Sequence, residues 1–201
     1  MAPDISTSLS PLQRRKRAAI LEGAQAVFLR HSFEVATMDD VAAAAGVGKQ
    51  TVYRHFGSKE ALFVALVISM CGEVGAFLSS GRGKQPDGTP EGELRELGWL
   101  LVQSLTEPDN LRLYRAIVAE AERLPELGPA FWDNGAKVVR AIAAKILRNR
   151  FDEPTAALRA ATFVQLVLGD AYLELTLGYV VPHVEERFSR QIEEAVAVVL
   201  R

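Results

Sequence analysis

Hydrophobic residues recur along this chain at intervals of three and four positions, the spacing that places side chains on one face of an α-helix. The segment Ser10-Pro11-Leu12-Gln13 predicts a helix start, because Ser is a favoured N-cap, Pro suits the first turn and Gln completes a capping box. Ile20, Ala24 and Phe28 then share one face of a helix expected to run to about Arg30. No segment shows the sustained alternation that is typical of strands, so the pattern predicts an all-α protein.

Later segments carry similar start and stop signals. Thr37 followed by two acidic residues predicts the N-cap of a short helix over 39–45, and Gly46 is suited to end it. The Gly- and Pro-rich segment 79–92 is the clearest loop. Further helices are expected over 49–55, 58–77, 91–105, 110–123, 126–150, 153–178 and 183–200.

Composition adds that the protein is of ordinary globular type. Its 201 residues are 49% hydrophobic and 24% charged. The single cysteine, Cys71, excludes an intramolecular disulfide and a Cys-based zinc cluster, and its apolar surroundings predict a buried structural thiol. The apolar stretches 61–77 and 160–181 are interrupted by polar residues, so neither is expected to span a membrane. We therefore expect a soluble, cytoplasmic protein.

The segment 37–56, TMDDVAAAAGVGKQTVYRHF, holds the most informative pattern. Two short helices joined by a Gly-containing turn can pack as a helix-turn-helix unit, because Ala42 is small and Val52 is apolar. The outer face of the second helix then offers groups suited to base edges and phosphate oxygens: Lys49, Gln50, Thr51, Tyr53, Arg54 and His55. The alternative is an ordinary helical hairpin with a solvated polar face.

The distribution of charge favours nucleic acid over that alternative. The net charge is −2, yet residues 1–60 carry eight Lys and Arg against six acidic residues. The cluster Arg14–Arg17 and the residue Lys59 flank the second helix of the pair in sequence, where they are suited to neutralise phosphates on either side of a groove.

The block from Arg17 to Leu62, which ends in TVYRHFGSKEAL, resembles the DNA-binding domain of the TetR/AcrR family of transcriptional regulators. The resemblance implies an N-terminal three-helix DNA-binding domain over 1–57. It also implies a C-terminal helical ligand-binding and dimerisation domain over 58–201, with helix 58–77 connecting the two. The segment 113–132 is similar to C-terminal domains in one AcrR-like branch.

The same resemblance implies roles for individual residues. Positions that usually hold phosphates are matched by Thr37, Tyr53, His55 and Lys59. The start of the recognition helix, where base contacts cluster, is matched by Gly48, Lys49, Gln50 and Thr51. Two positions depart from the family pattern: Ser32 replaces a common glycine, and Gly48 replaces a serine that often caps the recognition helix. The operator sequence of relatives therefore does not carry over.

A recognition helix this short reads only a few base pairs. We therefore expect a homodimer that binds a palindromic operator, with half-sites about 34–36 Å apart or a multiple of it, and an interface formed by the C-terminal helices. The family also implies a small-molecule effector, for which candidate lining residues are Trp99, Tyr114, Phe131, Trp132, Phe163 and Asp170. Core packing is the alternative for the aromatic residues. Asp170 and Glu174, four apart on one helix, are candidates for pocket groups, for ion pairs across the dimer or for solvent exposure.

Catalytic motifs are missing from the sequence: the three histidines are scattered, and neither a zinc helix nor a nucleophile elbow is present. We expect no enzyme activity, no metal and no cofactor. The favoured function is a transcriptional repressor that a small-molecule effector releases from double-stranded DNA. Two alternatives stay open: a helical small-molecule-binding protein without specific DNA recognition, and a transcriptional activator.

Overall fold

The first helix begins where its sequence signals predict. The amide of Gln13 donates to the Ser10 hydroxyl over 3.3 Å, and the Gln13 side chain accepts from the Ser10 amide over 2.8 Å. The computed structural model describes residues 10–80 and 88–201, and half of the predicted loop 79–92 lies outside this part of the chain. The described elements are α1 (Pro11–Phe28), α2 (Met38–Ala44), α3 (Lys49–Phe56), α4 (Lys59–Ser79), α5 (Pro90–Thr106), α6 (Pro108–Glu120), α7 (Leu127–Phe131), the π-helix η2 (Trp132–Ala136), α8 (Lys137–Leu147), α9 (Glu153–Thr176) and α10 (Val184–Val199). The predicted all-α fold is confirmed.

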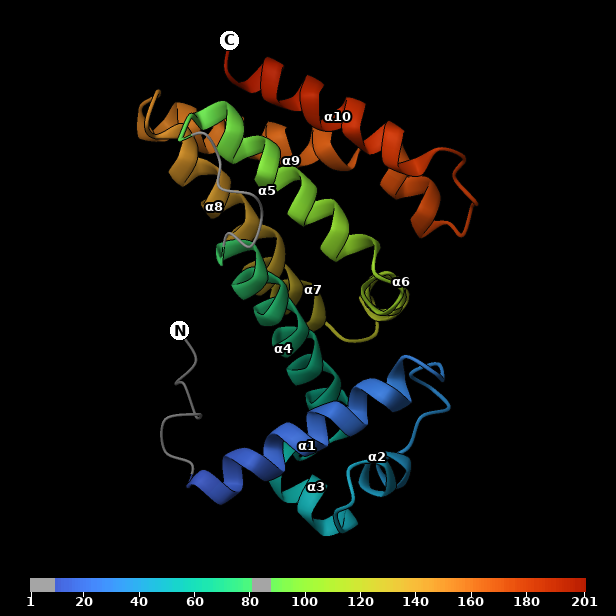
Figure 1. Ribbon diagram of the computed structural model, residues 1–201. Coiled ribbons are helices and arrows are strands. Elements are labelled where there is room, and N and C mark those ends of the chain that lie inside the picture. The colour runs from blue at the N-terminus through green and yellow to red at the C-terminus, as the bar shows by residue number, and fades with distance from the viewer. Residues whose placement is uncertain (1–9, 81–87) are drawn as a thin grey trace.

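The helices form two regions joined by α4. Figure 1 shows α1, α2 and α3 together at one end of the molecule, a region that we call the head. The body consists of α5 to α10, and α4 runs from the head into it. Within the body, α6 and α7 lie nearest the head, whereas α9 and α10 lie at the far end (Figure 1).

Buried apolar residues form two clusters, and their boundary differs from the boundary between head and body. One cluster fills the body around Leu101, Phe163 and Phe188. The other fills the head and the first half of α4, and it also includes Leu113 and Ile117 of α6 and Leu127 of α7. The α6–α7 segment therefore packs against the same core as the head. The division at residue 57 stays a prediction.

The first two helices cross at a glycine. A Cβ atom at Gly23 of α1 would lie 2.8 Å from the backbone nitrogen of Ala45 and 3.1 Å from the carbonyl oxygen of Val41, both closer than normal van der Waals contact. The turn after α2 uses Gly46 at φ +63, in the left-handed region that glycine tolerates best. These two glycines allow the short helix α2 to pack tightly against its neighbours.

Two long helices predicted in the body are interrupted. The helix expected over 126–150 is present from Leu127 to Leu147, but a π-helical turn at 132–136, which was not predicted, divides it into α7 and α8. A Cβ at Gly135 in this turn would lie 3.1 Å from Sγ of Cys71, so glycine allows the thiol to pack closely there. Cys71 is buried as predicted, and burial raises the pKa of its thiol to about 11. The second interruption is in α9, where Gly169 has φ 44 and ψ −154.

Helix α4 connects the two regions through their cores. Among the described residues, it is the one helix with the length and apolar composition of a membrane span. However, Leu62, Leu66 and Met70 are among its residues that are buried within the protein. A helix in the core of a folded protein has the same composition, so the apolar character of α4 is explained by its packing.

Candidate nucleic-acid interface

Thr37 fixes the start of α2, the first helix of the predicted pair. The Asp40 amide donates to the Thr37 hydroxyl over 3.1 Å, and the Asp40 carboxylate accepts from the Thr37 amide over 3.1 Å and from its hydroxyl over 2.6 Å. These hydrogen bonds from the Thr37 side chain and backbone lower the pKa of Asp40. Thr37 is exposed at this position. Its hydroxyl therefore caps α2, and the phosphate contact stays a prediction.

Helix α3 has one buried and one exposed side. Val52 and Phe56 pack into the head, whereas Tyr53 is 44% exposed. The remaining predicted contact residues divide into the exposed side chains Lys49, Gln50 and Arg54 and the half-buried side chains Thr51 and His55. The predicted polar side chains thus lie on the outer side of α3, exposed or half-buried. Contacts between these residues and DNA remain predictions.

The first turn of α3 lacks a side-chain cap. Gly48 is its N-cap residue, with φ −72 and ψ 145, and no side chain accepts a hydrogen bond from the first-turn amides. This agrees with the missing hydroxyl noted in the sequence. The positive end of the helix dipole at such a terminus favours negative groups, including phosphate.

Lys49 has a partner that the sequence did not indicate. Its ammonium group lies 2.9 Å from a carboxylate oxygen of Asp39, in the first turn of α2. The Asp39 hydrogen bond and charge raise the pKa of Lys49. Both side chains are more than half exposed, so the pair is screened by solvent and contributes little to stability. Asp39 also lies in the first turn of α2, where an acidic residue is favoured by the helix dipole alone, so the sequence carries no signal for its contact with Lys49.

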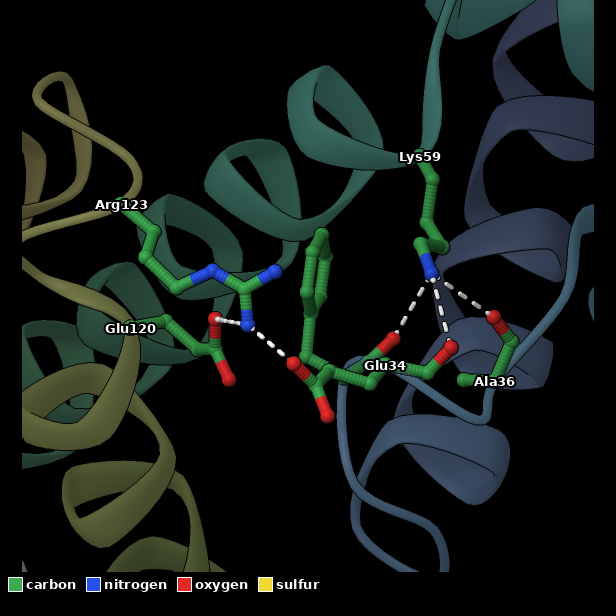
Figure 2. Close-up of polar contacts among 6 residues, drawn as sticks. Glu34, Ala36, Lys59, Glu120 and Arg123 are labelled. Atoms are coloured by element: carbon green, nitrogen blue, oxygen red, sulfur yellow. Dashed lines mark hydrogen bonds and ion pairs between the residues drawn. The ribbon is translucent and has the colours of Figure 1, made fainter.

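Lys59 contacts the turn between α1 and α2. Its ammonium group donates to the carbonyl oxygens of Phe33, Glu34 and Ala36 over 2.8, 3.3 and 3.1 Å. Figure 2 shows these three hydrogen bonds converging on the end of the side chain. A lysine has three N–H donors, so a phosphate contact by Lys59 would replace at least one of these bonds. That contact stays a prediction.

Positive charge gathers beside α3. The guanidinium of Arg17 lies 4.4 Å from the centre of the Phe56 ring, which connects the basic start of α1 to the end of α3. The pKa of His55 is lowered, first by partial burial and then by the charges of Arg54, Arg17 and Lys16. Three cationic side chains therefore act on one imidazole. DNA phosphates would reduce this repulsion.

The six candidate effector-binding residues are dispersed. Tyr114 and Phe131 are neighbours, with ring centres 5.7 Å apart, and Tyr172, which sequence reasoning missed, lies 5.8 Å from Tyr114. Phe163 is fully buried in the body core. Trp132 is exposed and has Arg140 over its ring, 4.6 Å from the centre. Asp170 is exposed. Of the six candidates, Tyr114 and Phe131 thus form one aromatic cluster, which Tyr172 completes.

Two surface cavities of the protein differ in character. Trp99 lines one of about 690 Å³, together with Leu175 of α9 and Phe188 of α10. The other has about 240 Å³ and lies between α1, α4, α5 and α6, with Gln25 and Asn110 among its lining residues. The first cavity is the larger, and two aromatic residues line it against one, Phe77, in the second.

Glu174 pairs within its own chain. Its carboxylate accepts two hydrogen bonds from the guanidinium of Arg187 of α10, over 2.6 and 3.1 Å. These bonds lower the pKa of Glu174. Within the single chain, Glu174 thus already joins α9 to α10, and an ion pair across the dimer stays a prediction.

Comparison with known proteins finds similarity to regulators in both regions. The curated relatives include the HTH-type transcriptional repressor AcnR of Corynebacterium efficiens, 39% identical over 62 residues, which are 31% of this chain and 32% of the relative. AcnR of Corynebacterium glutamicum is 44% identical over 50 residues, or 25% and 27% of the two chains. The matched segments thus span about a third or less of these relatives.

Solved structures match nearly the whole chain. A TetR-family transcriptional regulator from Mesorhizobium loti is 27% identical, with 95% of this chain and 98% of that chain covered and a TM-score of 0.83. The flavonoid-responsive regulator FrrA is 28% identical, with coverage of 93% and 96% and a TM-score of 0.73.

Family models account for most of the described residues. Residues 20–66 match the bacterial regulatory proteins of the tetR family, and residues 92–201 match the C-terminal domain of AefR-like transcriptional repressors. The second match covers more than half of the chain. The chain therefore belongs to the TetR family of bacterial regulatory proteins, with an AefR-like C-terminal domain.

Proposed function

We propose that this protein is a cytoplasmic, homodimeric transcriptional repressor that binds a palindromic operator and is released from it by a small-molecule effector. The observation that carries the proposal is the exposed polar face of α3, on a helix whose other side is fixed in the head by Val52 and Phe56. A helix held in this way keeps its polar side chains in a constant arrangement. Such an arrangement suits the major groove, which accommodates one α-helix.

The charges around α3 support binding to the DNA backbone. Arg17 and Arg54 lie near His55, at the end of the helix opposite to Lys49. Lysine and arginine at both ends of a reading helix can neutralise phosphates on the two sides of the groove. Curated relatives that match this region are named as repressors, which supports repression over activation.

Exposed apolar side chains support a dimer through the far end of the body. Leu158 and Leu173 of α9 and Val180 of the following loop are 71%, 55% and 92% exposed in the single chain. Association of two copies through this end would remove apolar surface from water. It would also hold two α3 helices in the fixed separation that a palindrome needs.

The body offers two places for an effector. One is the cavity of about 690 Å³ beside Trp99, a volume typical of small-molecule sites. The other is the aromatic cluster of Tyr114, Phe131 and Tyr172. The related regulator FrrA is named as flavonoid-responsive, so flavonoids are suitable first probes for binding to this protein.

Selection of fragments from genomic DNA with the purified protein tests the central proposal. We expect a palindromic sequence to be enriched, with an affinity that falls steeply as salt concentration rises, because phosphate contacts release counterions. If no sequence is enriched over the unselected genomic fragments, the proposal is contradicted. A protein that stays monomeric at the concentration used for binding would contradict the dimer.

Variants on α3 then test the individual contacts. Lys49→Ala and Tyr53→Phe should each weaken operator binding about three- to tenfold and leave the dimer intact, whereas Gln50→Ala should mainly reduce discrimination between sequences. The exposed residues Lys145 and Tyr179 of the body provide matched controls as Lys145→Ala and Tyr179→Phe. Equal losses in the control variants would show that the assignment of contacts is wrong.

A further inference from the structure

The turn between α1 and α2 is held by contacts from both neighbouring helices. The ring of Phe33 lies between Phe28 of α1 and Phe63 of α4, with ring centres 5.8 and 5.2 Å away. The Lys59 ammonium binds three carbonyl oxygens of the same turn, and it lies 4.5 Å from the centre of the Phe33 ring. We call residues 33–36 the hinge turn. Apolar packing and charge-assisted hydrogen bonds thus fix it to the start of α4.

The body also reaches this turn. Arg123, which follows α6, donates a hydrogen bond from its guanidinium to the carboxylate of Glu34. The same guanidinium nitrogen lies 3.7 Å from the carboxylate of Glu120, at the end of α6. Figure 2 shows the Arg123 side chain between Glu120 of the body and Glu34 of the head. The contact therefore bridges the two regions directly, without passing through α4.

The buried carboxylate of Glu120 helps to hold Arg123 in place. The residue is only 8% exposed, and its Oε2 atom has no hydrogen-bond partner among the described residues. A buried carboxylate oxygen without a hydrogen bond is stabilised by a nearby positive charge, and Arg123 supplies it. Leu113 and Ile117 of the same helix belong to the buried cluster of the head. Arg123 thus projects from a part of the body that is already packed against the head.

The hinge turn leads directly into the predicted DNA-reading unit. It is followed by Thr37, the N-cap of α2, and α2 packs closely on α1 at Gly23 and continues through Gly46 into α3. Because these helices are short and tightly packed, displacement of the turn would move α2 and α3 together. The position of the turn consequently sets how α3 is presented relative to the body.

We propose that Lys59 and Arg123 are positioning residues for DNA recognition: together they lock the hinge turn, and Arg123 is a route from body to head that is separate from α4. A change in the body that moves the end of α6 would reach α3 through Glu34. The effect on DNA rests on the proposed function above, whereas the lock itself is a property of the free protein.

Hydrogen exchange in the free protein tests the lock without DNA. The amides of Val35 and Ala36 both bond to the carbonyl oxygen of Ser32, so their exchange reports opening of the hinge turn. Arg123→Gln and Glu34→Gln should each raise exchange there about two- to fivefold, the range expected from an exposed ion pair. The double variant should exchange no faster than the faster single variant, because the two residues act as one pair.

A matched control is available on α6, the helix that precedes Arg123. Arg112→Gln removes the ion pair of Arg112 with Asp109, which has a 2.9 Å separation and does not involve the head. Its exchange at the hinge turn should equal that of the natural protein. If Arg123→Gln leaves exchange unchanged, or if Arg112→Gln raises it equally, the lock is disproved.

Binding to the selected operator tests the positioning role. Arg123→Gln and Glu34→Gln should weaken it about two- to fivefold, and Lys59→Met should weaken it at least tenfold, since charge-assisted hydrogen bonds are lost. The dependence of affinity on salt separates two roles for Lys59. An unchanged salt slope supports positioning, whereas a slope reduced by about one indicates a lost phosphate contact and overturns the assignment.

The two measurements fail independently. If the natural protein binds no selected DNA but the exchange results hold, the lock stands and the proposed function is wrong. If DNA binds and the exchange results fail, the proposed function stands and the lock is wrong. Operator affinity that is unchanged in Arg123→Gln, despite faster exchange, overturns the positioning role of Arg123.

Discussion

The head and the body are both helical, but different interactions determine their geometry. In the head, the long helix α1 and the short helices α2 and α3 are set by N-caps at Ser10 and Thr37, by the turn at Gly46 and by one close approach at Gly23. The body packs its helices around a large apolar cluster. Within the described residues, both interruptions of long predicted helices occur in the body. Close backbone contact and local caps thus fix the geometry of the head, whereas irregular backbone interrupts the long helices of the body.

The largest expected effect comes from the close approach in the head. Gly23→Ala places a methyl group 2.8 Å from the backbone nitrogen of Ala45, which cannot move independently of α2. We expect a loss of about 3 kcal/mol in the free energy of unfolding, at the upper end of overpacking effects. Denaturant unfolding measures it. Gly72→Ala is the control: nothing lies within 4 Å of a Cβ there, and an exposed helical alanine should stabilise by up to about 1 kcal/mol.

The corresponding substitution in the body should cost less. Gly169→Ala places a residue with a side chain at φ 44 and ψ −154, and its Cβ would lie 1.9 Å from Nε2 of Gln191. The Gln191 side chain can move, so backbone strain dominates, and we expect a loss of about 1–2 kcal/mol. The same unfolding measurement applies. A loss larger than that of Gly23→Ala would show that the body is the less adaptable region.

A missing cap in the head offers a gain in stability. Gly48 has an extended backbone that serine adopts readily, and nothing lies within 4 Å of a Cβ at this position. Gly48→Ser should add an N-cap to α3 and stabilise the protein by a few tenths to about 1 kcal/mol. Gly48→Ala restricts the unfolded chain in the same way but has no hydroxyl, so the difference between the Ser and Ala variants measures the contribution of the cap. Equal melting temperatures for the Ser and Ala variants would mean that no cap forms.

The smallest expected effect is a dependence on pH. The folded protein lowers the pKa of His55 below 6.5, so the unfolded chain binds the proton more strongly. The stability associated with neutral His55 is fully present above about pH 6.5 and is lost as the pH falls below this value. Thermal unfolding should therefore show a smaller decrease between pH 7.5 and 5.5 in His55→Gln than in the natural protein. If the stability of both proteins decreases equally, His55 does not cause the dependence on pH.

Much of the head could be predicted because its signals are local. The capping box at Ser10 joins residues three positions apart, as does the cap formed by Thr37 and Asp40. The polar face of α3 follows from helical periodicity over eight residues. In the body the helical segments were predicted, but the π-helical turn at 132–136 and the break at Gly169 were not, because neither carries a local signal such as proline.

The sequence by itself thus determined the helical class, the helix-turn-helix unit and the residues available on its outer face. Only the tertiary structure decided which of those residues already have partners and how head and body meet. Lys59 binds carbonyl groups 23 to 26 positions away, and Arg123 binds a carboxylate 89 positions away. Periodicity and capping act within about one helical turn, so contacts between distant segments depend on how the helices pack.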